Sequence, residues 1–327
     1  MDHRRVLKAF AALVALAAGL LPASALAQAT FTKPIRIIVP FAPGGTSDIL
    51  ARLISPKLQD ALGQPVVVEN KTGAGGNIGA DFVAKADKDG HTLLLLDVST
   101  LAISPSLMSN MTYSPTKELA SVGMISFAPY VLAVHPSVPV KTVAELVAHA
   151  KANPGKVPFG NAGIGVANHI SAVQLEKTWG VQFKHVPYRG GADAIKGTVS
   201  GESQVILNGA TATASFVAQG QLNGLAVSGD RRVESIKELP TFKELNVTPT
   251  EIGSWQGLLT TAGTPAPLQE RLNAELNKIL AMPDIAKRIQ DLGGEVKAGP
   301  PSALTQWIET NTASYAAIIK EAGIKVQ

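Results

Sequence analysis

The sequence lacks cysteine entirely. A chain without cysteine forms no disulfide bond, binds no metal through a thiolate and has no thiol nucleophile. It also has no cysteine near the N-terminus that could carry a lipid anchor. We therefore expect a freely diffusing protein.

Hydrophobic runs of membrane length are lacking as well. Residues 9–21 are apolar and follow a basic segment, but they are too short for a comfortable membrane span. The segment Ala25-Leu26-Ala27 has the small-x-small pattern that signal peptidase recognises. We therefore expect residues 1–27 to be a signal peptide, cleaved after Ala27, that exports the chain to the periplasm.

The sequence has no strong excess of charge of one sign. The formal net charge of the full chain is +4, and removal of Arg4, Arg5, Lys8 and Asp2 with the signal peptide leaves +2. No run or stripe of Lys and Arg is present. This pattern excludes nucleic acid as a partner.

Motifs for nucleotide binding and catalysis are also missing. Residues 73–78 (GAGGNI) have Ile78 where a dinucleotide-binding loop needs its third glycine, and residues 163–168 fail in the same way. No G-x-x-x-x-G-K-[ST], G-x-S-x-G or H-E-x-x-H motif occurs, and the histidines are scattered singly. We assign no catalytic residue, no cofactor and no metal ligand, and we expect a protein that is not an enzyme.

What the sequence does contain is an alternation of short β-rich runs with amphipathic helical stretches, which predicts an α/β fold. About 300 residues can bury a large core, and at that size two domains are expected. Pro56 predicts a kink or a break in the first helix, and Thr142 with Glu145 forms a capping box at the start of another. The predicted strands cover residues 35–39, 66–68, 93–96, 130–134, 159–160, 205–207 and 225–227, and the main helices cover 49–62, 142–153, 170–179, 268–280 and 305–322.

Two loops share one plan. Residues 41–46 and 161–166 each follow a strand, consist largely of glycine, alanine and other small residues, and lead into a helix. Such loops present backbone N–H groups and the positive end of a helix dipole, which suit a carboxylate or a phosphate. The alternative is an ordinary tight turn between strand and helix. If the loops face each other from two groups of βα units, they form a cleft.

Other polar and aromatic residues fit structural roles. Asp48 lies at a helix start, where we expect it to accept backbone N–H groups rather than act as a general base. His169 follows the second loop, and a capping or packing role is the alternative to a role in binding. We expect Trp255 to pack in the core or at a hinge, and Arg189 to lie on the surface.

These segments together resemble a known family, the Bug or TctC-type substrate-binding proteins of tripartite tricarboxylate transport systems. The resemblance runs in order through nearly the whole mature chain. It rests on residues 40–48 (PFAPGGTSD), 68–79 (VENKTGAGGNIG), 89–92 (DGHT), 159–165 (FGNAGIG) with His169, 186–191 (VPYRGG), 225–227 (LAV), 240–241 (PT), 254–257 (SWQG) and 263–265 (GTP).

The resemblance implies a periplasmic binding protein fold of type II, in which two α/β domains close on a ligand in the cleft between them. Domain 1 would comprise residues 28–128, domain 2 residues 129–224, and residues 225–327 would return to domain 1 and add C-terminal helices. The crossing strands would lie near 129–131 and between 225 and 259. Such a monomer would bind a small organic carboxylate for the membrane subunits of a transporter; the alternative partner is a sensor kinase, and a third possibility is an enzyme on this fold.

The family also implies which residues hold the ligand, from loops of both domains. We expect these to be Phe41, Ala42, Gly44, Gly45, Thr46, Ser99, Thr100, Asn161, Ala162, Gly163, Gly165, Val166, His169 and Asn208. Three of them depart from the family pattern. Asn161 replaces a common serine, Val166 replaces a small hydroxyl residue, and Asn208 replaces an acid that could bind a ligand ammonium. The changes at 166 and 208 argue against an amino-dicarboxylate and leave a plain carboxylate ligand open.

Overall fold

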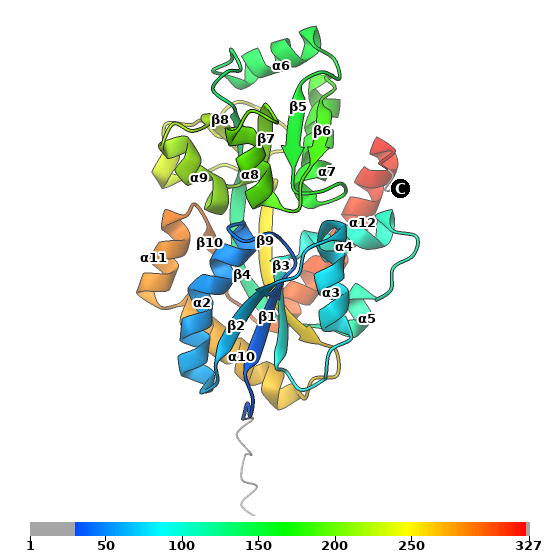
Figure 1. The fold of residues 1–327 in the computed structure, drawn as a ribbon, viewed down its shortest axis with the longest axis vertical. Helices are drawn as coiled ribbons and strands as arrows, with labels where there is room; N and C mark the ends of the chain where they lie inside the picture. Colours follow the sequence, from blue (N-terminus) through cyan, green and yellow to red (C-terminus); the bar gives the residue numbers. More distant parts are fainter. Residues whose placement is uncertain (1–29, 325–327) are drawn as a thin grey trace, which may run out of the picture. The chain divides into compact units, whose positions relative to one another are not determined.

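Ten strands form one mixed β-sheet in the computed structural model, which describes residues 30–324 (Figure 1). The expected signal peptide and its cleavage site lie outside these residues. The first half of the sheet has parallel β1, β2 and β3, with antiparallel β9 and β10 added through β3 and β4. Its strands are β1 (Ile35–Val39), β2 (Val66–Asn70), β3 (Thr92–Asp97), β9 (Gly253–Thr261) and β10 (Glu295–Val296).

The second half of the sheet is organised around parallel β5, β6 and β7. Its strands are β5 (Pro158–Asn161), β6 (Lys184–Pro187), β7 (Val205–Gly209) and β8 (Asn223–Val227). Both β7 and β8 pair antiparallel with the end of β4. This half carries a second set of βα units, as the sequence predicted.

The long strand β4 (Leu119–Val134) connects the two halves (Figure 1). Up to Pro129 it pairs with β9, and from Tyr130 onward it pairs with β7 and β8. Ser228 ties this point to the start of β9, because its hydroxyl accepts a hydrogen bond from the Tyr130 N–H at 2.7 Å and donates one to the carbonyl of Ile252. The change of partners falls where we expect a crossing strand; that the halves move as domains stays a prediction.

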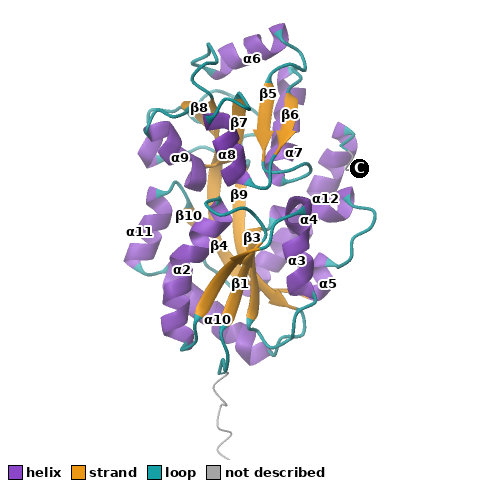
Figure 2. Cartoon of the chain, viewed as in Figure 1, coloured by secondary structure: helices purple, strands orange, loops and turns teal. Residues whose placement is uncertain are grey.

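Helices cover both faces of the sheet (Figure 2). Around the first half lie α2 (Thr46–Leu62), α3 (Asn77–Ala84), α4 (Ser99–Leu107), α5 (Pro115–Glu118), α10 (Ala266–Leu280), α11 (Pro283–Asp291) and α12 (Pro301–Ala322), with the 3-10 turn η1 (Ala74–Gly76). Around the second half lie α6 (Val143–Ala152), α7 (Ala167–Trp179), α8 (Gly191–Val199) and α9 (Ala210–Ala218), with η2 (Glu234–Ile236). None of the helices within residues 30–324 has the length and apolar content to cross a membrane. The prediction of an α/β fold is confirmed.

The central strands are buried on both faces. In β3, Leu93 and Leu95 pack into one hydrophobic cluster with α2 and α10, whereas Leu94 and Leu96 pack into another cluster on the opposite face. All four leucines are fully buried. Because successive side chains of a strand point to opposite faces, a strand covered on both sides reads as a continuous apolar run. This explains why β1 and β3 were readily predicted.

Two local expectations have different outcomes. The expected break at Pro56 is wrong, because α2 continues through it to Leu62. Pro56 has no N–H to donate to the carbonyl of Arg52, but this carbonyl lies on the exposed face, where the Ser55 hydroxyl donates to it at 3.5 Å. The predicted cap of α6 is confirmed, since the Thr142 hydroxyl accepts a hydrogen bond from the Glu145 N–H at 3.1 Å.

Candidate ligand-binding site

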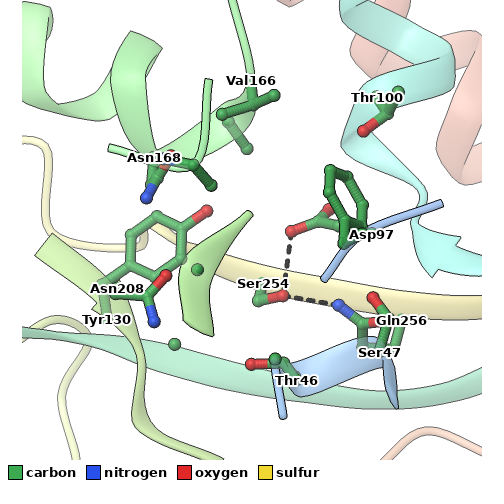
Figure 3. Close-up of a pocket in the computed structure, with 16 residues that line it drawn as sticks. Thr46, Ser47, Asp97, Thr100, Tyr130, Val166, Asn168, Asn208, Ser254 and Gln256 are labelled. Carbon is green, nitrogen blue, oxygen red and sulfur yellow. Dashed lines mark hydrogen bonds between the residues drawn. The ribbon is translucent and has the colours of Figure 1, made fainter. Parts of the chain in front are cut away.

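A cavity lies between the two halves of the sheet, and both contribute side chains to it (Figure 3). The first half and its helices contribute Phe41, Gly45, Thr46, Ser47, Asp97, Thr100, Ser254 and Gln256. The crossing strand and the second half contribute Tyr130, Ala162, Val166, Ala167, Asn168, Gly191, Asn208 and Gly209. The site is therefore assembled from segments that are distant in the sequence.

Several helices begin at this cavity. Helices α2, α7 and α8 begin there with Thr46, Ala167 and Gly191, respectively. In addition, Gly209 is the N-cap of α9, and Thr100 lies in the first turn of α4. The N-terminal turn of a helix leaves backbone N–H groups without intrahelical partners and carries a partial positive charge. Within residues 30–324, no Lys, Arg or His lines the cavity. Any attraction of this lining for an anion must therefore come from the helix N-termini.

The first predicted loop uses its own N–H groups to hold its shape. The Gly44 N–H donates to Oδ2 of Asp48 at 2.9 Å, and the Ala42 N–H donates to the carbonyl of Arg189 at 3.3 Å. The next N–H groups, of Thr46 and Ser47, have no acceptor within the described part of the chain. The N–H groups available to a ligand are therefore those of the first turn of α2, one step beyond the glycines.

Asp48 is the centre of the network that fixes this loop. It is nearly fully buried, and it also accepts hydrogen bonds from Arg52 at 3.0 Å and from Asn70 at 3.0 Å. Burial alone would raise the pKa of Asp48, but the hydrogen bonds from Arg52, Gly44 and Asn70 outweigh it and hold the pKa below its ordinary value. The expectation that Asp48 accepts a backbone N–H agrees with this geometry.

The second predicted loop is fixed by the same principle. The Gly163 N–H donates to Oδ1 of Asn161 at 3.0 Å, the Ala162 N–H to Oδ1 of Asn168 at 3.3 Å, and the Gly165 N–H to Nδ1 of His169 at 3.3 Å. The N–H groups of Ala167 and Asn168, at the start of α7, have no acceptor among residues 30–324. Here too, the first turn of the helix offers the donors.

His169 supports the second loop from behind. Its side chain is buried, and its ring packs edge-on against the ring of His185 with centroids 4.7 Å apart. Burial, and then the neighbouring His185, lower the pKa of His169 to about 4. The ring is therefore neutral at physiological pH and can accept the Gly165 N–H. This geometry gives His169 a role in shaping the loop.

A chain of hydrogen bonds runs along the floor of the cavity (Figure 3). The Ser47 hydroxyl donates to Oε1 of Gln256 at 2.7 Å, Nε2 of Gln256 donates to Ser254 at 2.6 Å, and the Ser254 hydroxyl donates to Oδ2 of Asp97 at 2.9 Å. Burial raises the pKa of Asp97 to about 6, although donors from Ser254 and Ser99 oppose the shift. The chain links α2, β9 and β3 at the site.

The predicted site residues fall into two groups. Phe41, Gly45, Thr46, Thr100, Ala162, Val166 and Asn208 line the cavity. The others do not line it: Ala42, Gly44, Ser99, Asn161, Gly163, Gly165 and His169, of which Gly165 lines a neighbouring cavity with Val166 and Thr100.

Sequence reasoning missed Ser47, Asp97, Tyr130, Ala167, Asn168, Gly191, Gly209, Ser254 and Gln256, all of which line the cavity. The residues of α2 and α7 directly follow the predicted loops, so the helix starts were the signal for them. Ser254 and Gln256 lie on β9, whose sequence has no clear strand pattern. The expectations for Trp255 and Arg189 are confirmed. Trp255 packs against Phe127 and Trp307, and the Arg189 side chain is 81% exposed.

A mixed sheet in two halves, with a cavity bordered by helix N-termini between them, is typical of a solute-binding protein. Within residues 30–324, no group of three or more His, Asp or Glu side chains is arranged to hold a metal ion. The sequence profile of the tripartite tricarboxylate transporter family receptors matches residues 50–324. The chain belongs to this family, whose members are solute-binding proteins and not enzymes.

Solved structures support this assignment. The periplasmic binding protein BugD is 32% identical, with 91% of this chain and 100% of BugD covered and a TM-score of 0.86. A protein of R. palustris with adipate is 30% identical, with coverage of 90% and 98% and a TM-score of 0.86. MatC from Rhodopseudomonas palustris with bound malate is 27% identical, with coverage of 88% and 99% and a TM-score of 0.83. The periplasmic binding protein fold is thereby confirmed.

Proposed function

We propose that this protein binds a small organic carboxylate in the cavity between the two halves of its sheet. The observation that carries the proposal is the meeting of the first turns of α2 and α7 at a cavity whose described lining has no cationic side chain. Backbone N–H groups fixed in this way can bind a carboxylate without the cost of rearranging the loops. Adipate and malate bound to two structurally similar proteins are consistent with this ligand class.

We propose that the protein, once it has bound its carboxylate, delivers it to a membrane transporter. The family is named for receptors of tripartite tricarboxylate transporters. A signalling role, in which the loaded protein docks on a sensor kinase, is the alternative. The genes next to this one discriminate between the two: genes for membrane permease subunits support delivery, and a sensor kinase gene without them supports signalling.

We also propose that the chain reaches the periplasm as a monomer after cleavage behind Ala27. Osmotic shock of expressing cells should release a protein that begins at Gln28, as N-terminal sequencing would show. A chain that stays in the membrane fraction with residue 1 intact contradicts this part of the proposal.

A thermal-shift screen of mono- and dicarboxylates tests the binding function. A ligand at one hundred times its dissociation constant stabilises the folded protein by about 2.7 kcal/mol if it binds only the folded state. Chromatography of the same mixtures should recover the acid unchanged. Failure of every carboxylate to shift the melting temperature overturns the proposal, and a new product in the mixture shows that the protein is an enzyme.

A further inference from the structure

Asp97 is the one side chain with a formal charge among the described residues that line the cavity. It ends β3 and is half-buried, with its open side toward the cavity. Its Oδ1 accepts the Ser99 N–H at 3.0 Å and its Oδ2 accepts the Ser254 hydroxyl at 2.9 Å. The backbone N–H of Trp255 also donates a hydrogen bond to this carboxylate. In Figure 3 its carboxyl group and the Tyr130 hydroxyl are directed toward the same open space.

Nothing in residues 30–324 neutralises Asp97. It forms no salt bridge there, and the other titratable groups whose charge it affects are Tyr130 on β4 and Tyr315 on α12. Asp97 raises the pKa of both phenols, after burial, so both stay neutral. With a pKa of about 6, Asp97 itself is largely ionised at pH 7.5. The cavity therefore combines helix N-termini that attract an anion with one carboxylate that repels it.

A ligand with opposite charges at two ends satisfies both features. Its carboxylate would face the first turns of α2 and α7, and a cation would face Asp97. An ammonium group fits this position, because it has three N–H donors and its positive charge is attracted by the ionised carboxylate of Asp97 at the cavity. Sequence reasoning looked for such an acid at position 208, where the chain has Asn208 on β7. The structure supplies an acid to the same cavity from β3 instead.

We propose that the ligand is a zwitterion, a small carboxylate that also carries an ammonium group, and that Asp97 is the residue that selects it. This inference rests on the proposed carboxylate-binding function and names its substrate class. A carboxylate without an ammonium group would have to bind beside an ionised Asp97 or take up a proton with it, and either requirement weakens its binding at pH 7.5.

Titration calorimetry with matched acids tests this selection. Succinate, malate and aspartate share one carbon skeleton and differ by a hydrogen, a hydroxyl or an ammonium group; glutarate and glutamate extend the comparison by one carbon. At pH 7.5 the natural protein should bind the amino acid of a set at least about tenfold more tightly than the unsubstituted acid, which corresponds to about 1.4 kcal/mol. Malate should lie between succinate and aspartate.

The variant Asp97→Asn should reverse this preference, because it removes the charge but keeps the shape. Its affinity for the amino acid should fall about tenfold or more, whereas its affinity for the unsubstituted acid should stay equal or rise. Asp60→Asn, on the exposed face of α2, makes the same change in charge away from the cavity and should leave the preference unchanged. The ratio of two affinities within one protein does not depend on how much of a variant is folded.

Measurements at pH 5 compare the natural protein with Asp97→Asn, because succinate and glutarate also begin to take up a proton near this pH. Asp97 is then largely protonated, so the preference for the amino acid should shrink more in the natural protein than in Asp97→Asn. An equal or stronger binding of succinate or glutarate by the natural protein at pH 7.5 overturns the inference and leaves the carboxylate-binding function intact. An absence of binding by all five compounds counts against the inference, while the wider screen of carboxylates decides the function separately.

Discussion

The backbone N–H of Gly44 donates a 2.9 Å hydrogen bond to Oδ2 of Asp48, four residues further along the chain. The loop that leads into α2 is thus held by a side chain from the first turn of the same helix. In the proposed binding mode, a ligand meets a loop whose shape is already set, with the N–H groups of Thr46 and Ser47 next to it. We therefore expect Asp48 to affect binding although it does not line the cavity.

Replacement of Asp48 by alanine should therefore lower both stability and affinity. The change leaves the Gly44 N–H and the Asn70 amide without their acceptor, and we expect a loss of about 1–3 kcal/mol in the free energy of unfolding at pH 7. Because the folded pKa of Asp48 lies below the ordinary value of 3.8, its contribution is complete above pH 4 and is lost as the pH falls through the folded pKa. Urea denaturation at several pH values measures this.

Asp60→Ala, on the exposed side of the same helix, is the matched control and should cost less than about 0.5 kcal/mol. A difference between Asp48→Ala and the natural protein that stays constant from pH 7 to pH 2 contradicts the role assigned to the ionised carboxylate.

Substitution of Gly44 or Gly163 by valine should abolish ligand binding and leave a folded protein. The φ angles of these glycines are +86° and +135°, which a β-branched residue adopts only with strain of about 1–3 kcal/mol. A Cβ at Gly163 would come no closer than 3.6 Å to its neighbours, so backbone strain rather than crowding displaces the loop. Calorimetry gives the affinity and circular dichroism shows whether each variant is folded.

Gly63→Val makes a comparable change at the end of α2, where φ is +69° and a Cβ would meet no other atom within 4 Å. It should destabilise the protein but leave the affinity as it is. Normal binding by folded Gly44→Val and Gly163→Val would show that the two loops do not form the site.

His169 should make the protein less stable as the pH falls, whereas a histidine whose pKa is the same in the folded and unfolded states has no such effect. Its folded pKa of about 4 is below the ordinary 6.5, so the unfolded chain binds a proton that the folded chain does not. The stability it contributes is complete above pH 6.5 and is lost as the pH falls toward 4, by at most about 3 kcal/mol. His169→Asn keeps an acceptor for the Gly165 N–H but does not titrate.

Chemical denaturation between pH 7 and pH 4 should therefore give a shallower loss of stability in His169→Asn than in the natural protein. His149→Asn on α6 controls for the loss of a histidine elsewhere. Parallel curves for the natural protein and His169→Asn would show that His169 is not held neutral.

Ligand binding should close the two halves of the molecule about the junction at Pro129 and Tyr130. The N–H donors of α2 alone would bind a carboxylate weakly, because water competes for it. When the donors of α7 also reach the ligand and water is excluded, each of these polar interactions becomes stronger. Small-angle scattering should show a smaller radius of gyration at saturating ligand than without it, if the free protein is open. An open free form whose radius does not change on saturation contradicts closure.

The predictable part of this fold is the part governed by local pattern. The runs at 35–39 and 93–96 are apolar without interruption, Arg36 aside, because β1 and β3 are buried on both faces. The strand β9 was expected only as a crossing strand somewhere between residues 225 and 259, because no local pattern marked its bounds at Gly253 and Thr261. Its place beside β3 and β4 depends on long-range pairing that no local pattern encodes.

The site was predictable only to the level of its loops. Glycine-rich composition located two loops that border the cavity, but it could not show that Asp48, Asn161, Asn168 and His169 accept hydrogen bonds from the N–H groups of those loops. Nor could it bring Asp97 to the same cavity, since this depends on the order of strands in the sheet. Local sequence is enough to locate the loops, whereas the full set of cavity residues depends on how the strands are arranged in the sheet.

The most direct test of the account is a crystal structure of the mature protein with a carboxylate identified by the thermal-shift screen. We expect its carboxylate oxygens to lie about 2.7–3.2 Å from the backbone nitrogen of Thr46 or Ser47 and from the backbone nitrogen of Ala167 or Asn168. A ligand bound instead in the separate cavity lined by Arg231 and Arg232, with the space between α2 and α7 filled only by solvent, would contradict the account.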